Sequence, residues 1–370
     1  MAEPPAAALA ELIGEVGPVE AARLVVARQV PDGVAAETGA RRADQRADAD
    51  LSAIAALGGR LVVPEDDEWP QEAFTCFGTP MALADERWRA PVALWVRGAA
   101  RLDELGERAV AVVGARAATG YGEHVAAEFG YGLADGAVAV VSGAAFGIDG
   151  AAHRGALAAD GRTVAIQACG LDRAYPAGHQ RLLDQIAQRG AVLSEYPPGV
   201  RPARYRFLVR NRLIAAFAAG TVVVEAGVRS GARRTAAAAA ALGRIVMAVP
   251  GPITSALSIG CHLLVREEQA ILVTRAAEVL EAVGPIGTDL APTLSTPLRR
   301  TDGLSSELLA VYEALPVGGG PRHPEQLTRD SGVPLHRVRS ALPLLELQGL
   351  VGCGVSGWYR VPSGSGRGGP

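Results

Sequence analysis

Two glycine-bearing loops stand where short apolar runs end and helical patterns begin. The first, GARAATGYG, follows the run at 109–113, and the second, SGAAFGID, follows the run at 137–141. Backbone N–H groups at the start of a helix bind anions, and glycine lets a ligand approach the chain closely. Arg116 adds a guanidinium that can donate two hydrogen bonds to one phosphate. The candidate phosphate contacts in these loops are Gly114, Arg116, Gly120, Ser142 and Gly143.

Several cofactor classes are excluded by residues that the sequence lacks. The glycine order differs from the dinucleotide pattern GxGxxG, and Ser142 stands where a dinucleotide ribose needs an acid. All 36 basic residues are arginine, so a Walker P-loop and Schiff-base chemistry, which need lysine, are absent. The four cysteines form no CxxC pair. We therefore expect no cofactor and no metal.

The stretch from 196 to 235 carries eight arginines against one acid, Glu225, although the whole chain has a formal net charge of −3. A run of charge is often only a solvated face. Here Tyr205 and Phe207 alternate with arginines, which suits a single nucleic-acid strand, because its phosphates need charge and its bases need flat surfaces for stacking. Ser230 and Gly231 precede a further helical pattern and offer another anion site.

Asp149 and His153 lie one helical turn apart in the second loop and the pattern after it. A metal or acid–base role is one interpretation, but two groups at this spacing do not complete a zinc site. We favour a hydrogen-bonded pair that fixes a helix against the sheet.

Short apolar runs alternate with helical patterns between residues 109 and 283. Continuous apolar runs are typical of strands buried on both faces, so the sequence predicts a doubly wound α/β fold with a mostly parallel sheet. In such sheets ligands bind beyond the carboxyl ends of the strands, where the loops described above would lie. The expected strands are 109–113, 137–141, 163–168, 191–194, 221–225, 245–249 and 270–273.

The segments before residue 109 and after residue 283 have the sequence patterns of smaller units. Residues 1–60 read as a small helical domain with a break at Gly17-Pro18, and 61–108 as a connecting extension. The Pro-, Thr- and Gly-rich stretch 284–301 is typical of a linker. Residues 302–361 predict a helix-turn-helix followed by a hairpin, the winged-helix pattern, and 362–370 a disordered tail.

Within the winged unit, Arg337 and Arg339 fall on the expected recognition helix, and Pro343 should kink or end this helix. The ligand of the winged unit stays open. The N-terminus has no basic region before its apolar residues, so we expect no secretory signal. The uncharged run 245–265 contains Pro250, Gly251 and Pro252, which argues against a membrane helix. A cytoplasmic protein is expected.

Seven motifs in order resemble the DNA-processing protein A family (DprA, also called Smf) over about residues 60 to 283. They are VAVVGARAATGYG, SGAAFGIDGAAH, GLDRAYP, SEYPPG, FLVRNRLIAAF, VVVEAGVRSGARRTAAAAAALGR and VPG. The resemblance implies an extended Rossmann-like domain with a helical N-terminal domain and a winged helix. It also implies a non-enzymatic binder of single-stranded DNA that protects incoming strands in natural transformation or recombination, loads RecA, and forms a homodimer.

The resemblance also implies roles for individual residues. Arg116 would contact phosphates, and Ser142 and Gly143 would line the same pocket. The residues that would hold the strand are Arg204, Phe207, Arg210, Asn211 and Arg212. The sequence departs from the family pattern at Ala115, Leu208, His262 and Arg233-Arg234.

Two other functions stay open at this point. The same architecture resembles nucleoside monophosphate phosphoribohydrolases, for which Glu225 is the nearest acid, although their PGGxGT loop is missing. A transcription regulator acting through the winged helix is the other alternative. Truncation at residue 301 would separate it from a mediator, because a regulator would lose DNA binding.

Overall fold

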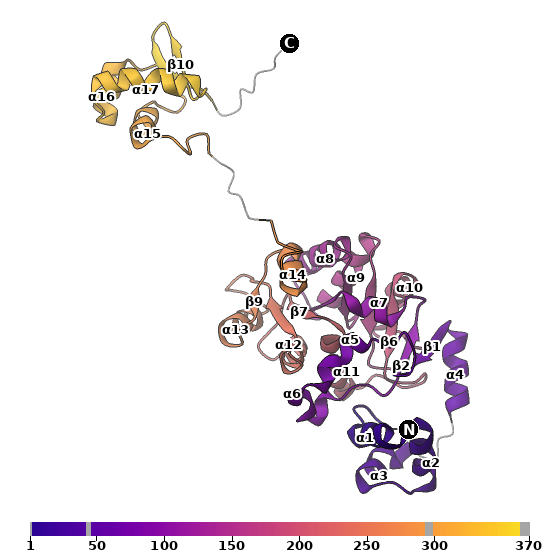
Figure 1. The fold of residues 1–370 in the computed structure, drawn as a ribbon. Helices are drawn as coiled ribbons and strands as arrows, with labels where there is room; N and C mark the ends of the chain where they lie inside the picture. The colour runs from indigo at the N-terminus through magenta and orange to yellow at the C-terminus, as the bar shows by residue number, and fades with distance from the viewer. Residues whose placement is uncertain (1, 42–45, 293–298, 363–370) are drawn as a thin grey trace. The chain divides into compact units, whose positions relative to one another are not determined.

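A computed structural model describes residues 2–41, 46–292 and 299–362. The chain divides after residue 292 into two compact units (Figure 1). Part of the expected linker, 293–298, and the expected tail apart from Pro362 lie outside the described residues.

The larger unit is built on a nine-stranded sheet with the order β1-β2-β6-β5-β4-β3-β7-β8-β9. All neighbours from β6 to β9 are parallel, and β1 and β2 are antiparallel additions at one edge. This confirms the doubly wound, mostly parallel fold. The strands are β1 (Gly59–Val62), β2 (Leu94–Arg97), β3 (Ala109–Val113), β4 (Ala139–Ser142), β5 (Thr163–Ile166), β6 (Ala191–Ser194), β7 (Gly220–Val223), β8 (Ile245–Ala248) and β9 (Ile271–Leu272).

Helices cover both faces of this sheet. The central strand β3 is fully buried, and alternate residues point into opposite cores: Val110 and Val112 into one, Ala111 and Val113 into the other. The first core is covered by α8 (Gly120–Asp135), α9 (Ile148–Ala158) and α14 (Ala276–Val283), with α10 (Gln180–Arg189) packed beside α9. The second is covered by α5 (Gln71–Phe74), α7 (Leu102–Glu107), α11 (Arg204–Phe217), α12 (Gly231–Ala241) and α13 (Ile259–Glu267).

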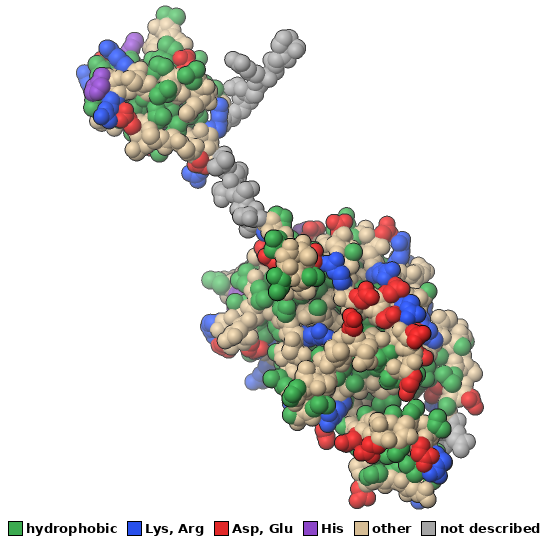
Figure 2. Space-filling view, viewed as in Figure 1, with side chains coloured by type: hydrophobic (Ala, Val, Ile, Leu, Met, Phe, Trp, Pro, Cys, Tyr) green, Lys and Arg blue, Asp and Glu red, His purple; other side chains and the backbone are tan. Residues whose placement is uncertain are grey.

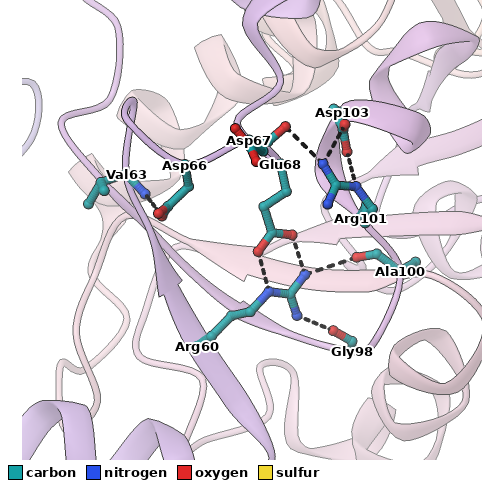
Figure 3. A network of polar contacts seen from close by, with 9 residues as sticks. All are labelled: Arg60, Val63, Asp66, Asp67, Glu68, Gly98, Ala100, Arg101 and Asp103. Carbon is teal, nitrogen blue, oxygen red and sulfur yellow. Dashed lines mark hydrogen bonds and ion pairs between the residues drawn. The ribbon is translucent and has the colours of Figure 1, made fainter.

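The expected connecting extension is part of the sheet, which corrects its predicted role. It contains β2 and the second half of β1. Arg60, in the first half of β1, is tied to the loop that follows the strand. The Arg60 guanidinium pairs with both oxygens of Glu68, at 2.6 and 2.5 Å, and donates to the carbonyl of Ala100 (Figure 3). Arg101 makes a similar two-point contact with Asp103. The short elements of this region are η2 (Thr75–Gly78), α6 (Pro80–Leu83) and η3 (Glu86–Trp88).

The N-terminal helices α1 (Ala7–Val16), α2 (Pro18–Ala27) and α3 (Asp32–Thr38) share a small apolar core of their own. Gly17 ends α1 with a φ of 80°, which favours glycine, and Pro18 opens α2, as the sequence indicated. In contrast, α4 (Ala47–Ala56) places Ile54 in the core of the sheet domain. The remaining single turns are η1 (Gly39–Arg41) and η4 (Ala177–His179).

The smaller unit has the expected helix-turn-helix and hairpin, with its own apolar core. Pro343 lies inside α17 and does not end it, so of the two expected effects, a kink or an end, the second is wrong. Arg337 pairs with Glu307 at 2.8 Å and Arg339 pairs with Glu325 at 2.8 Å. The elements are α15 (Ser306–Glu313), α16 (Pro324–Ser331), α17 (Leu335–Leu347), β10 (Val351–Gly354) and β11 (Gly357–Arg360).

Among the described residues, none of the helices has the length and apolar character that crossing a bilayer requires. The uncharged run 245–265 instead contains β8, a loop and much of α13.

Candidate nucleic-acid interface

The strand order reverses between β3 and β7, and a cavity of about 620 Å³ opens beside this point. Such switch points are where open α/β sheets bind ligands, because the loops that leave the two strands diverge there. We call this cavity the switch-point cleft. Of the residues expected from the sequence, it is lined by Gly114, Arg116, Arg204, Phe207, Arg210, Asn211, Ser230 and Gly231. It is also lined by Ala115, Asp149, Tyr175, Leu208 and Arg229, which the list of candidate contacts did not include.

An aromatic side chain, Phe207 of α11, stands among cations in the cleft. The guanidinium carbon of Arg116 lies 5.0 Å from the centre of the Phe207 ring, and that of Arg210 lies 6.0 Å away. The ring of Tyr175 packs on Phe207 with centroids 5.0 Å apart. Phe207 is therefore held in place while it stays half-buried, so part of its surface is open to a base. Tyr175 comes from the motif GLDRAYP, which precedes the arginine-rich stretch 196–235, so the alternation of arginine and aromatic residues in that stretch does not reveal it.

Arg210 forms the floor of the cleft. Its Nη1 donates to the carbonyls of Gly143, at 3.1 Å, and Ile166, and burial lowers the pKa of the guanidinium to about 10. A Cβ on Gly143 would lie only 2.4 Å from that nitrogen. Ser142 is fully buried and donates its hydroxyl hydrogen to the carbonyl of Val112 at 2.7 Å. The structure thus places both Ser142 and Gly143 outside the lining of the cleft, where Gly143 supports Arg210 and Ser142 bonds to the neighbouring strand β3.

Asp149 and His153 do not form the expected pair. Asp149 accepts a hydrogen bond from the N–H of Ala145 at 3.3 Å, and burial raises the pKa of its carboxyl group while the charge of Arg210 opposes this. His153 Nδ1 bonds to the Thr163 hydroxyl at 2.7 Å. Because that hydroxyl donates to Val140, it accepts from His153, which leaves Nε2 unprotonated and without a partner. Burial lowers the pKa of His153 to about 3.

One glycine of the first loop, Gly122, makes room for an internal side chain. The buried Glu225 carboxylate accepts hydrogen bonds from the N–H of Thr119, at 2.9 Å, and from its hydroxyl, at 2.6 Å. A Cβ on Gly122 would lie 2.3 Å from the same carboxylate, so this glycine makes room for an internal acid. Gly120 is exposed at the start of α8 and does not line the cleft. The Thr119 hydroxyl accepts from the N–H of Gly122 at 3.1 Å and so caps the start of α8, and the expected ligand contact at Gly120 stays a prediction.

Arg212 was also expected to contact the strand, but its side chain lies inside the protein. Its side chain is 1 % exposed, and it pairs with both oxygens of Glu195, at 2.5 and 2.7 Å. The Nε–H donates to the carbonyl of Arg89 at 2.9 Å. A guanidinium so enclosed holds α11 against neighbouring segments and does not reach a ligand.

The arginine-rich stretch therefore divides into internal and exposed members. Arg206 pairs with Glu3 at 2.6 Å, and Arg233 pairs with Glu268. Arg116, Arg204 and Arg229 line the cleft, are exposed, and have no ion pair with any described residue. Acidic and basic side chains are interspersed over the face of the larger unit that Figure 2 shows.

The first turn of α12 completes the cleft. Ser230 is the N-cap and accepts from the N–H of Arg233 at 3.3 Å, and Gly231 and Ala232 follow it along the cleft wall. A helix start carries partial positive charge and free N–H groups, so this wall favours an anion. His262, a departure from the family pattern, bonds to the carbonyl of Gly251 at 3.1 Å and lies outside the cleft lining.

These features together suit phosphate and base binding by the same cleft. Three unpaired guanidinium groups and a helix start can hold phosphates, and the open part of Phe207 can stack a base. Among the described residues, no group of three His, Cys, Asp or Glu side chains is placed to hold a metal ion. Glu225 does not line the cleft, and both of its oxygens are engaged by Thr119.

Known proteins are similar to this chain in sequence and in fold. The profile described as DNA recombination-mediator protein A matches residues 60–284, and the DprA winged helix domain matches residues 295–353. The putative DNA processing protein DprA of Mycobacterium tuberculosis is 53% identical over 367 residues, covering 99% of this chain and 94% of that protein. Protein Smf of Escherichia coli is 35% identical, covering 81% of this chain and 77% of its own.

Solved structures agree with the sequence comparisons. The crystal structure of DprA from Streptococcus pneumoniae superposes with a TM-score of 0.61 at 35% identity, covering 75% of this chain and 92% of that one. A DprA structure from Helicobacter pylori superposes with a TM-score of 0.51 at 25% identity, covering 60% of this chain and 94% of that one. With the switch-point cleft and the winged unit in place, the chain belongs to the DNA-processing protein A (DprA/Smf) family of DNA recombination mediators.

Proposed function

We propose that this chain binds single-stranded DNA in the switch-point cleft and acts as a recombination mediator without chemical turnover. The observation that carries the proposal is the contact between Arg116 and Phe207 inside a cleft rimmed by unpaired arginines. Guanidinium beside an open aromatic ring matches one phosphate and one base of a single strand. The DprA of Helicobacter pylori, whose structure is described as giving insight into its single-stranded DNA binding mode, supports the same ligand.

The family membership supports three further parts of this proposal. The protein protects incoming strands and loads RecA on them in natural transformation or recombination, it works in the cytoplasm, and it acts as a homodimer. Support for self-association comes from β9, which ends the sheet and leaves Ile271 and Leu272 about half exposed, at 47% and 50%. An uncovered apolar edge strand is a common pairing surface. Light scattering of the wild type and of Ile271→Asp tests the dimer, and a monomeric wild type refutes it.

The DNA proposal is tested by anisotropy of a labelled oligothymidylate over a salt series. Arg116→Ala should weaken binding about tenfold and reduce the salt slope by about 0.7, the value for one lost phosphate contact on a single strand. The matched control is Arg181→Ala, which removes an exposed arginine of α10 outside the cleft. Equal effects of the two variants would contradict the proposed site. Wild-type binding that does not depend on salt would contradict the proposed ligand.

Two companion assays test the remaining parts. Incubation with nucleoside monophosphates should release no free base, and release that Glu225→Gln abolishes would instead establish an enzyme. RecA assembly on strands covered by single-strand-binding protein should be faster with wild type than with Arg116→Ala. Equal assembly rates would refute loading through this cleft.

A further inference from the structure

A second cavity, of about 570 Å³, adjoins the switch-point cleft. Leu208 of α11, which is 45% exposed, lines both cavities and forms the ridge between them. Helices α11 and α12, which pack side by side (Figure 1), supply wall residues to both. We call the second one the indole cavity. Its wall includes Trp88, Leu208, Val209, Arg234, Ala237 and Ala241.

The indole cavity repeats the chemistry of the cleft. Trp88, the last residue of η3, is half-buried against the main core, and the guanidinium of Arg87 lies 5.4 Å from its ring centre. Arg234 of α12 is exposed and has no ion pair with any described residue. The small side chains of Ala237 and Ala241 leave space beside the indole. A flat aromatic surface with an unpaired cation at its rim is again a fit for a base and a phosphate.

The charge on this side of α12 points to a polyanion. Its neighbour Arg233 is neutralised by Glu268 and also donates to the carbonyl of Val228 at 2.9 Å. Arg87 is likewise paired, with Asp85 at 2.6 Å. Arg234 therefore keeps a full charge on the cavity wall without an acid to oppose it. A neutral apolar partner would cover the indole but leave this guanidinium desolvated without compensation.

We propose that the indole cavity is a second base-binding subsite for the strand that occupies the switch-point cleft. The strand crosses the Leu208 ridge, one of its bases stacks on Trp88, and Arg234 contacts the adjoining phosphate. This inference rests on the proposed function, since it requires a strand in the first cleft. It assigns roles to Trp88 and Arg234, which lie outside the switch-point cleft.

The test is a series of oligothymidylates from about two to about twelve nucleotides, a range that brackets one binding unit. Trp88→Ala and Arg234→Ala should bind the shortest oligonucleotides like wild type and the longest about tenfold more weakly. Arg116→Ala should bind every length more weakly. Trp88→Phe keeps an aromatic surface and should restore affinity, which separates stacking from a folding defect. Arg181→Ala is the control for charge and should match wild type throughout.

Tryptophan fluorescence gives a second readout. Long oligonucleotides should quench the wild type, and this quenching should be lost in Trp88→Phe although binding persists. If Trp88→Ala and Arg234→Ala match wild type at all lengths while Arg116→Ala does not, the second subsite is refuted and the proposed function stands. If Arg116→Ala also matches wild type, the proposed function itself is refuted.

Discussion

Replacing Arg212 by alanine should destabilise the protein and spare the chemistry of the cleft. Arg212 is 1 % exposed and its partner Glu195 5 % exposed, and two hydrogen bonds of 2.5 and 2.7 Å join them. Removing the cation leaves a buried carboxylate without a partner, which costs about 3–5 kcal/mol. At about 2–4 °C per kcal/mol for a domain of this size, the melting temperature should fall by roughly 6 to 20 °C.

The assay is thermal unfolding followed by circular dichroism, with Arg116→Ala as the matched control. Arg116 loses the same charge but is exposed, so its melting temperature should stay within about 1 °C of wild type. The double variant Arg212→Met, Glu195→Gln should be less destabilised than the two single losses combined, because neither charge is then buried alone. If Arg212→Ala melts like wild type, the buried ion pair does not stabilise the fold, and Arg212 is again a candidate for contact with the ligand.

Three further outcomes follow from the same geometry. Gly143→Ala should weaken DNA binding and lower the melting temperature, because its Cβ would lie 2.4 Å from the Arg210 guanidinium, whereas Gly120→Ala, with nothing within 4 Å, should change neither. Burial lowers the pKa of His153 to about 3, so between that pH and about 6.5 the unfolded chain binds a proton that the folded chain excludes. The free energy of unfolding should therefore fall with decreasing pH in this range, by up to about 1.4 kcal/mol per pH unit. His153→Gln should flatten this dependence in denaturant titrations. Truncation at residue 301 should retain most single-strand binding in the anisotropy assay, and its loss would favour the regulator alternative.

The architecture could be predicted because each parallel strand has a local sequence pattern. Runs such as 109–113 are uninterrupted, apolar and bounded by glycine, which leaves few alternatives to a buried parallel strand. The two antiparallel strands, β1 and β2, escaped prediction for the opposite reason. β2 spans only Leu94–Arg97, and its place in the sheet depends on antiparallel pairing with β6, which is about a hundred residues later in the chain. Such a distant pairing leaves no local pattern.

The roles of glycine could not be separated from the sequence. Gly122 and Gly143 lie in loops whose composition suits a phosphate, yet the space that each leaves open is filled by a side chain of the protein, Glu225 and Arg210 respectively. Both partners are more than sixty residues away. A glycine that admits a ligand and one that admits an internal side chain have the same local sequence, so only the fold distinguishes them.

The same limit applies to charge, and it explains where the functional arginines are found. Arg206, Arg212 and Arg233 are neutralised by Glu3, Glu195 and Glu268, which all lie outside the stretch 196–235 that made its charge conspicuous. Counting charge within the stretch therefore overstated its free positive potential. Four exposed arginines without an ion pair to a described residue share a cavity with an aromatic residue: Arg116, Arg204 and Arg229 line the cleft with Phe207, and Arg234 lines the second cavity with Trp88. An unpaired guanidinium beside an open aromatic surface gains most from a phosphate that arrives with a base attached, so the pairing of the two groups, and not the number of arginines, predicts the path of a single strand.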